Sequence, residues 1–551
     1  MANESGRTNR SHDVVIVGAG ISGIYMLHRA RQFGLDAIAL EAGSGVGGTW
    51  YWNRYPGARC DIQSLEYSYS FDEQLQQEWH WPEKYSSQAD ILDYLNHVCD
   101  RFGLRSGIQL DTRVESATYD EERGRWLVAT DRGAIDAQFV VMATGSLSSA
   151  NTPDIPGLDR FAGHLLHTAR WPHEPVDFSD QRVAVVGTGS SGVQVAPEIA
   201  RQAARLYVLQ RTASHSLPSN NGPLDPELEA SIKAEYAAFR EANRRMPAAT
   251  GAGHLHAIHD ESALEVGPDE RQRAFEESWT KGGFTFTQTY RDLVVDRAAN
   301  ALASEFIREK IHSIVHDPTV AELLTPKLLI GCKRMCIDSG YYEMFNRPNV
   351  ELVDVSETPI TALTEHHLHV GNRAIEVDAI VFATGFDAMT GSLLRIDIRG
   401  RRGVTLREAW DDGPGTYLGL TVAGFPNLFT ITGPGSPSAL TNVIMSAEHH
   451  VEWVTECIDH MRRHGHRTVE ATANAQRAWG EHVESVAATS LRTDPTCNSW
   501  YLGSNISGKK RQFMLLLGFP AYVERCAEIA ASGYDGFQFD TSPAGIGGVA
   551  T

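Results

Sequence analysis

Two glycine-rich turns constrain the fold of this chain more than any other feature. The first, GAGISG at residues 18–23, follows an apolar stretch at 14–17 and leads into an amphipathic segment from Ile21 to Phe33. The second, GTGSSG at 187–192, has the same surroundings. A strand, a G-x-G-x-x-G turn and a helix form a dinucleotide-binding unit in which phosphates bind at the helix N-terminus. Two such units predict an α/β fold with two Rossmann-like domains.

The first turn has the features of a site for an adenine dinucleotide with a free ribose. Gly18 allows the tight turn, Gly20 lets the backbone approach a pyrophosphate, and Gly23 lets the helix pack closely on the strand. The following strand, 37–40, ends in Glu41, which is placed to accept hydrogen bonds from ribose hydroxyls. We therefore expect this turn to bind FAD.

The second turn differs at the end of its second strand. That strand ends in Gln210-Arg211-Thr212, without a carboxylate. An acid would repel a 2′-phosphate, whereas Arg211 can bind one through two parallel hydrogen bonds. We expect NADPH here, contacted by the turn residues Gly187, Thr188, Gly189, Ser190, Ser191 and Gly192.

The order of motifs predicts that the NADPH domain is inserted into the FAD domain. Two apolar strands end in Ala-Thr-Gly, at 143–145 and 383–385, and such strands close nucleotide-binding domains. The predicted units are a FAD domain (1–145 and 386–540), an NADPH domain (146–222 and 331–385), a helical insertion (223–330) and flexible tails (1–11 and 541–551). His254, His256 and His259 in the insertion lack regular ligand spacing, so a solvated loop is favoured over a metal site.

Charge and cysteine content limit the function further. The formal net charge of −20 repels phosphate backbones and anionic lipid, so neither a nucleic-acid nor a membrane role is expected. The seven cysteines form no C-x-x-C motif, which favours reduced thiols and a cytoplasmic protein. A disulfide reductase would need a cysteine pair near either turn. The segment directly after the first unit, GVGGTWYWNRYPGARCD, contains only Cys60, so that class requires a pair assembled from distant residues.

The segment between the turns indicates a family. Residues 161–172, FAGHLLHTARWP, resemble the fingerprint of the Baeyer–Villiger monooxygenases through Phe161, Gly163, His167, Trp171 and Pro172. A second fingerprint of that family matches at Gly47-Gly48-Thr49-Trp50, Tyr55-Pro56-Gly57 and Asp61. The resemblance extends from about residue 12 to 540, and it looks closest to the phenylacetone and steroid monooxygenase branch.

This resemblance implies an activity and a set of roles. The activity is NADPH- and O2-dependent conversion of ketones to esters or lactones through a C4a-peroxyflavin, with sulfoxidation as a side reaction. Arg334 matches the catalytic arginine, a permanent cation suited to stabilising negative charge on oxygen, and Asp61 matches the carboxylate that positions it. Further expected cofactor contacts are Gly48, Thr49, Trp50 and Asp61 for FAD, and Lys333, Arg211 and Thr212 for the 2′-phosphate of NADPH.

Three other segments receive roles from the same resemblance. Trp500 lies on a Gly/Ser/Asn-rich loop that is expected to close over the nicotinamide, although Ser507 replaces a usual proline and Lys509-Lys510-Arg511 is unusually basic. The substrate pocket is expected to include Ser438, Ala439 and Leu440. The 161–172 motif is expected to be a linker, with His167 holding it in register rather than acting as a base.

Several alternatives stay open at this point. A flavin-containing monooxygenase making S-oxides or N-oxides is the second interpretation, and a non-catalytic NADPH or redox sensor is the third. Cyclic, aryl-aliphatic and steroid ketones are all compatible substrates. A monomer and a homodimer are both compatible with the sequence.

Overall fold

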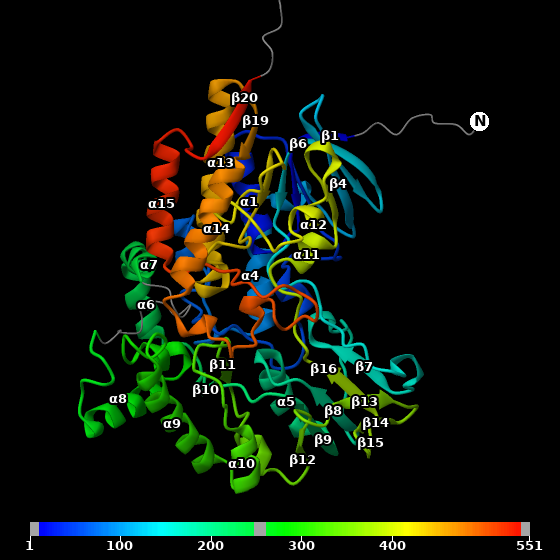
Figure 1. Ribbon diagram of the computed structural model, residues 1–551, viewed down its shortest axis with the longest axis vertical. Helices are drawn as coiled ribbons and strands as arrows, with labels where there is room; N and C mark the ends of the chain where they lie inside the picture. Colours follow the sequence, from blue (N-terminus) through cyan, green and yellow to red (C-terminus); the bar gives the residue numbers. More distant parts are fainter. Residues whose placement is uncertain (1–9, 247–259, 542–551) are drawn as a thin grey trace, which may run out of the picture.

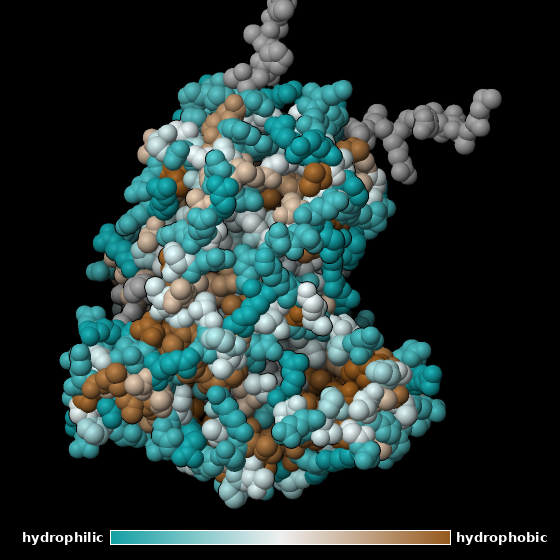
Figure 2. Space-filling view, viewed as in Figure 1, coloured by the Kyte–Doolittle hydropathy of each residue, from teal (hydrophilic) through white to brown (hydrophobic). Residues whose placement is uncertain are grey.

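The computed structural model describes residues 10–246 and 260–541, and it confirms the predicted α/β class (Figure 1). Each glycine-rich turn follows the carboxyl end of an inner strand of its own mainly parallel sheet. The first sheet occupies the upper part of the view and the second the lower right, with a block of helices at the lower left. The surface seen in this view is largely hydrophilic, and hydrophobic side chains gather mainly on its lower part (Figure 2).

The first sheet is centred on β1 (Arg10–Val17), which pairs in parallel with β2 (Ala37–Leu40) and β6 (Gly133–Met142). Residues 14–16 of β1 are fully buried, as expected for a parallel strand covered on both faces. The order is β17-β4-β5-β6-β1-β2-β3, with β18 also pairing with β6. The remaining strands are β3 (Ile108–Gln109), β4 (Val114–Asp120), β5 (Arg125–Thr130), β17 (Asp397–Arg399) and β18 (Leu428–Thr430). C-terminal strands thus complete a sheet that the N-terminal part begins.

The second sheet is entirely parallel, in the order β12-β9-β8-β16-β7. Its strands come from both sides of the helical block, as the predicted insertion requires, while the residue limits of the domains stay predictions. A small antiparallel sheet, β13 (Ile360–Leu363), β14 (His367–Val370) and β15 (Arg373–Glu376), follows β12 in the chain. The five strands of the main sheet are β7 (His164–His167), β8 (Arg182–Val186), β9 (Arg205–Gln210), β12 (Val350–Asp354) and β16 (Ala379–Phe382).

Helices cover the first sheet and connect distant parts of the chain. The long helix α13 (Val443–His464) packs on α1 (Ile21–Gln32), where the Tyr25 hydroxyl donates to Glu452 at 2.9 Å. The helix α4 (Gln88–Arg101) begins at a capping box between Ser87 and Asp90. The other elements of this part are α2 (Thr49–Trp52), α3 (Glu73–Glu78), α11 (Gly391–Leu394), α12 (Leu406–Ala409), α14 (Ala473–Ala487), α15 (Phe519–Ala531), β19 (His466–Ala471) and β20 (Phe537–Thr541).

The predicted helical insertion is confirmed as a block of helices beside the second sheet. Asp296 caps the longest of them by accepting from the backbone N–H groups of Ala298 and Ala299. The three histidines at 254, 256 and 259 lie outside the described residues. The block comprises α6 (Pro226–Ala234), α7 (Tyr236–Arg245), α8 (Pro268–Lys281), α9 (Arg297–Ile314) and α10 (Pro318–Leu324), and the short strands β10 (Ser216–Pro218) and β11 (Cys336–Asp338) pair beside it.

Residues 10, 11 and 541, assigned to the predicted tails, belong to strands instead, and the rest of both tails lies outside the described residues. Residues 10 and 11 belong to β1 and pair with Ile135 and Asp136, while Thr541 ends β20. The correction has a simple reason, because polar residues at a strand end are held by the backbone ladder whatever their side chains. None of the helices within 10–246 and 260–541 combines the length and hydropathy needed to span a bilayer.

Candidate active site

The first glycine-rich turn is packed so tightly that a side chain would clash at two of its positions. Gly18 has a φ of 105°, and a Cβ there would lie 2.6 Å from the carbonyl oxygen of Ala143. A Cβ at Gly23 would lie 1.9 Å from the carbonyl oxygen of Gly18, so only glycine lets α1 approach β1 this closely. Gly20 caps α1 without a side-chain hydrogen bond, which leaves N-terminal N–H groups as donors for a pyrophosphate.

The Gly47–Trp50 segment covers this turn. Gly48 has a φ of 55°, and a Cβ there would lie 2.9 Å from the Cα of Gly20. Gly48 also caps α2, again without a side-chain hydrogen bond. The Trp50 indole is buried and its Nε1–H donates to the Tyr67 hydroxyl at 3.1 Å. Gly48 thus lies against the first turn, and the contacts of Gly48, Thr49 and Trp50 with FAD stay predictions.

Glu41 has backbone partners that the sequence did not indicate. Its carboxylate oxygens accept from the N–H of Ala19 at 2.9 Å and of Gly43 at 2.8 Å. Burial raises the pKa of Glu41, although these two hydrogen bonds oppose the shift. A carboxylate has about four acceptor sites, so two backbone donors leave capacity for a ribose hydroxyl. The ribose role stays a prediction.

The second turn repeats the sterics of the first but has an open face. Gly187 has a φ of 110°, and a Cβ there would lie 2.6 Å from the carbonyl oxygen of Ala383. A Cβ at Gly192 would lie 2.1 Å from the carbonyl oxygen of Gly187. At Gly189, which caps α5 (Ser190–Gln202), a Cβ would meet no heavy atom within 4 Å. Ser190 and Ser191 form the first turn of α5, at the helix end expected to bind phosphate.

Two cations lie at the end of β9, next to this turn. The Thr188 hydroxyl donates to the carbonyl oxygen of Thr212 at 3.0 Å and fixes the turn against the strand end. Burial, together with the nearby positive charge of Arg211, lowers the pKa of Lys333. Neither Arg211 nor Lys333 forms an ion pair with any carboxylate in the described ranges. Two adjacent cations without a protein counter-charge suit a doubly negative 2′-phosphate.

Arg334 and Asp61, far apart in the sequence, form a bidentate ion pair. Arg334 Nε donates to Asp61 Oδ2 at 2.7 Å, and Nη2 donates to Oδ1 at 2.8 Å. Burial alone would lower the pKa of Arg334, but the charge and hydrogen bonds of Asp61 outweigh it and raise that pKa above its ordinary value. The guanidinium is thus a fixed cation at every working pH.

Two further contacts orient this guanidinium. Its Nη1 donates to the carbonyl oxygen of Ala439 at 2.9 Å, and its central carbon lies 4.9 Å from the ring centre of Phe284. The segment around Ala439 is the predicted substrate pocket, in the short helix η7 (Ser438–Leu440). Ser438 and Leu440 are buried, so Ala439 is the partly exposed member of the three.

The 161–172 motif forms the edge of the second sheet through β7, which pairs in parallel with β16. Phe161 and Trp171 are buried, and a Cβ at Gly163 would lie 2.2 Å from the carbonyl oxygen of Asp378. Pro172 follows immediately in an irregular segment. The motif is thus placed where the chain enters the second sheet, and its linker role stays a prediction.

His167 is engaged in local hydrogen bonds. Its Nδ1 accepts from the backbone N–H of Ala169 at 3.0 Å, which places the ring proton on Nε2. Nε2 lies 3.4 Å from both the carbonyl oxygen of Asn151 and the hydroxyl of Thr384. Burial lowers the pKa of His167, so a neutral ring is favoured. These contacts agree with a role in holding the segment in register.

The loop that carries Trp500 is held by the basic run noted in the sequence. We name residues 488–518, between α14 and α15, the C-terminal loop. Lys509 pairs with Asp387 at 2.7 Å, and Lys510 donates to the carbonyl oxygen of Asp412. Arg511 donates to carbonyl oxygens within the same loop, including that of Asp494 at 2.8 Å. The unusual charges thus hold the loop in place.

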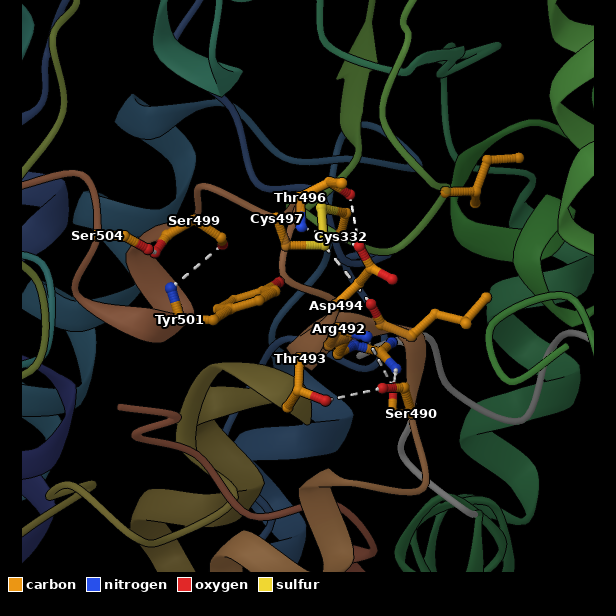
Figure 3. Close-up of a disulfide and its surroundings, with 12 residues drawn as sticks. Cys332, Ser490, Arg492, Thr493, Asp494, Thr496, Cys497, Ser499, Tyr501 and Ser504 are labelled. Atoms are coloured by element: carbon orange, nitrogen blue, oxygen red, sulfur yellow. Dashed lines mark hydrogen bonds between the residues drawn. A yellow bond between two sulfur atoms is a disulfide. The ribbon is translucent and has the colours of Figure 1, made fainter. Parts of the chain in front are cut away.

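One cysteine prediction is wrong. Cys332 and Cys497 form a disulfide across a sequence separation of 165, with Cα atoms 5.4 Å apart (Figure 3). Tertiary folding brings the two together, and no sequence spacing could reveal that. The other five cysteines are free and buried, in agreement with the reduced thiols expected. The disulfide joins the segment before Arg334 to the C-terminal loop, rather than lying within either glycine-rich turn.

Two further residues near Arg334 were missed. Tyr501 is buried in η9 (Trp500–Leu502), where burial raises its pKa while the charges of Arg334 and Arg492 oppose that shift. Its ring lies 4.4 Å from that of Trp500. Phe284, in the helical block, packs on the guanidinium of Arg334. Neither belongs to a recognisable motif; only the neighbouring Trp500 hinted at Tyr501.

Two dinucleotide turns of opposite electrostatic character, beside a fixed arginine, define a flavoprotein with two dinucleotide-binding domains. Comparisons with known proteins agree. The sequence family described as "Pyridine nucleotide-disulphide oxidoreductase" matches residues 15–267. A "Baeyer-Villiger monooxygenase" of Pseudooceanicola batsensis is 40% identical over 528 residues, covering 95% of each chain. "Phenazine N-monooxygenase PhzNO1" of Lysobacter antibioticus is 39% identical over 541 residues, covering 97% of this chain and 98% of that protein.

A solved structure described as "Oxidized steroid monooxygenase bound to NADP" is 52% identical, with a TM-score of 0.91, covering 97% of this chain and 100% of that one. The chain belongs to the Baeyer–Villiger monooxygenases, flavoproteins that use FAD, NADPH and O2 to convert ketones to esters or lactones. The predicted family, activity and cofactors are therefore confirmed. The roles of individual residues stay predictions.

Proposed function

We propose that this protein inserts an oxygen atom beside the carbonyl of a ketone, with Arg334 and Asp61 as its catalytic pair. The observation that carries the assignment is the bidentate ion pair at 2.7 and 2.8 Å, which joins residues 273 positions apart. FAD is assigned to the first turn, with Gly18, Gly20 and Glu41. NADPH is assigned to the second turn, with Arg211 and Lys333.

FAD, once reduced by NADPH, supplies the oxygen-activating chemistry. The protein must then stabilise negative charge that develops on the reacting oxygen atoms. Arg334 can do so without giving up a proton, because a guanidinium keeps its charge at any working pH. Asp61 takes two of its donors and Ala439 takes a third, so the guanidinium is oriented before substrate arrives.

The substrate is assigned to the side of Arg334 that faces Ala439. Because the η7 carbonyl is bonded to the guanidinium, a change in this segment would displace the catalytic cation as well as the pocket wall. Cyclic, aryl-aliphatic and steroid ketones remain the candidate classes. The cytoplasmic location and the choice between monomer and homodimer stay predictions.

The test is the variant Arg334→Ala, assayed with NADPH and a panel of ketones. Removing the cation should reduce ester or lactone formation by about 100-fold or more, the effect typical of losing one charge-stabilising donor. NADPH oxidation should continue, with hydrogen peroxide replacing the ester. Mass spectrometry of the product and a peroxide assay measure both.

Arg308→Ala is the matched control, since Arg308 is an exposed arginine of α9 paired with Glu305. It should behave like the unaltered protein. Normal ester yield from Arg334→Ala would refute the assignment. Loss of bound flavin in that variant would instead indicate a structural role.

N-oxygenation is the second candidate activity, favoured by the 39% identical phenazine N-monooxygenase. The lone pair of an amine or thioether attacks oxygen directly. This reaction forms no tetrahedral oxyanion and therefore needs no cation to stabilise one. We therefore expect Arg334→Ala to impair S- or N-oxidation much less than ester formation. Equal loss of both activities would contradict that distinction.

A further inference from the structure

The Cys332–Cys497 disulfide joins a segment held by a buried asparagine to an irregular part of the C-terminal loop. On the Cys332 side, Asn300 of α9 is fully buried, and its amide nitrogen donates to the carbonyl oxygens of Leu293 at 2.7 Å and Ile330 at 3.0 Å. The Asn300 side-chain oxygen accepts from the N–H of Ile330 at 3.1 Å. Asn300 thus holds both the N–H and the carbonyl group of Ile330, two residues before Cys332.

The Cys497 side is irregular chain between two short 3-10 helices, η8 (Leu491–Thr493) and η9. Many of its hydrogen bonds are local, such as Cys497 N–H to the carbonyl oxygen of Asp494 at 2.9 Å. Its contacts with the helical block include Leu491 N–H to Val294 at 3.2 Å and an ion pair between Asp494 and Arg297. Between η8 and η9 the disulfide therefore adds a cross-link to these contacts with the helical block, whereas the later part of the loop is held separately, for example by the ion pair of Lys509 with Asp387.

The loop held in this way carries groups that lie at the catalytic pair. Cys332 precedes Arg334 by two residues, and Cys497 precedes Trp500 by three. Figure 3 shows Tyr501 in the same loop as Cys497 and Arg492, close to the disulfide. Burial raises the pKa of Tyr501, and Arg334 and Arg492 lie near enough for the charges of both arginines to oppose that shift. The position of Tyr501 against Arg334 therefore depends on where the disulfide holds the loop.

We propose that Cys332 and Cys497 form a reversible redox site that couples the thiol state of the protein to the seating of the C-terminal loop on Arg334. In reduction, a small dithiol gives two electrons and two protons to the S–S bond, which yields two cysteine thiols and the oxidised, cyclic form of the dithiol. In oxidation, hydrogen peroxide takes two electrons and two protons from the thiols, which yields the disulfide and two water molecules.

Burial makes the coupling work in both directions: the disulfide affects the position of the loop, and the position of the loop affects access to the disulfide. Cys332 is 0% exposed and Cys497 1% exposed, so a reductant reaches the sulfurs only when the loop lifts. Linkage requires that anything favouring the seated loop also protects the disulfide. If the loop closes over the nicotinamide of bound NADPH, as the family resemblance implies, NADP+ should slow reduction by dithiothreitol. Only this point and the catalytic readout below rest on the proposed function.

The first experiment counts thiols in the flavin-loaded protein. Five of the seven cysteines are free, so iodoacetamide in denaturant should label five before reduction and seven after it. Peptide mass spectrometry should find 332 and 497 as the two newly labelled positions. Hydrogen peroxide should restore the count of five. Seven labelled cysteines in both the purified and the peroxide-treated protein would overturn the proposal.

The second experiment follows the loop by hydrogen–deuterium exchange. Reduction with dithiothreitol should speed exchange in peptides from 488–505 by roughly tenfold, because opening the loop no longer requires moving a cross-linked chain. Peptides from α5 should be unchanged. In turnover assays, reduction should raise the KM for NADPH several-fold and increase the share of NADPH that ends as peroxide. A purely structural disulfide would change thermal stability but not that share.

Variants keep the test independent of the reductant. Cys497→Ala and the double variant Cys332→Ala/Cys497→Ala should match the reduced protein and ignore dithiothreitol. Cys457→Ala, a buried thiol of α13, is the matched control and should respond like the unaltered protein. A disulfide whose removal changes neither loop exchange nor peroxide release would overturn the proposal. Altered exchange in a protein that makes no ester with any ketone would instead refute the proposed function and leave the redox site standing.

Discussion

The turns at 18–23 and 187–192 have the same tight backbone packing but different surroundings. In both, a Cβ on the first glycine would lie 2.6 Å from the carbonyl oxygen of an Ala-Thr-Gly segment. Beyond that they diverge. A Cβ at Gly20 would lie 3.2 Å from the Cα of Gly48, whereas at Gly189 it would meet nothing within 4 Å. The acid of the first unit, Glu41, is buried, and the cation of the second, Arg211, is exposed.

This difference separates a cofactor that stays from one that exchanges. A turn covered by a second segment must open before its ligand leaves, so the first suits FAD, which is recycled within the enzyme. An open turn beside an exposed cation, Arg211, suits NADPH, which enters and leaves in each cycle. The same motif thus serves a resident group and a substrate, and its surroundings decide which.

The largest effect is expected when the same clash is introduced into each turn. Gly23→Ala and Gly192→Ala each place a Cβ about 2 Å from a carbonyl oxygen, at 1.9 and 2.1 Å respectively. Such overpacking typically costs about 1–3 kcal/mol or more. We expect Gly23→Ala to lose its yellow colour and Gly192→Ala to keep FAD but bind NADPH poorly. The flavin absorbance per protein and NADP+ titration measure this.

Gly480→Ala serves as the control, because a Cβ there meets no atom within 4 Å and helix α14 favours alanine. It should match or exceed the stability of the unaltered protein. If Gly192→Ala also lost FAD, the two turns would not be independent sites.

A smaller effect is expected at the charge that distinguishes the second turn. Arg211→Ala should raise the KM for NADPH by about 10- to 100-fold, since a hydrogen bond to a charged group is worth about 1.5–3 kcal/mol. The KM for NADH, which lacks the 2′-phosphate, should barely change. Steady-state kinetics with both cofactors test this, and Arg201→Ala, an exposed arginine of α5 paired with Glu198, is the control. Equal increases in the KM values for NADPH and NADH would show that Arg211 does not bind the 2′-phosphate.

The smallest effect concerns pH. Burial and Arg211 lower the pKa of Lys333, so it loses its charge at a lower pH than an ordinary lysine. The KM for NADPH should therefore rise through the alkaline range, while the KM for NADH stays flat. Without cofactor, the unfolded chain binds this proton more tightly, so Lys333 makes the free energy of unfolding increase with pH between the two pKa values. In Lys333→Arg the alkaline rise in the KM for NADPH should disappear. A rise of equal size with NADH would exclude Lys333 as its source.

Much of the fold could be predicted because its signals are local. The strand at 37–40 was placed to the residue, and α1 ends one residue before the predicted Phe33. Motifs indicated the neighbourhoods of Gly48, which lies against Gly20, and of Lys333, which lies near Arg211, while their cofactor roles stay predictions. Partners were less predictable, since the bond from the Ala19 N–H to Glu41 and the ion pair between Lys509 and Asp387 depend on segments that touch only after folding.

The sequence by itself determined the two dinucleotide units, their contrasting charge and the family. A turn, a helix start and a strand are specified by neighbouring residues, whose backbone sterics are the same wherever they occur. Only the tertiary structure decided that Arg334 bonds Ala439, that Tyr501 lies near Arg334, and that Cys332 meets Cys497. These contacts join residues more than 100 positions apart, and they exist because packing of the cores brings those segments to one place.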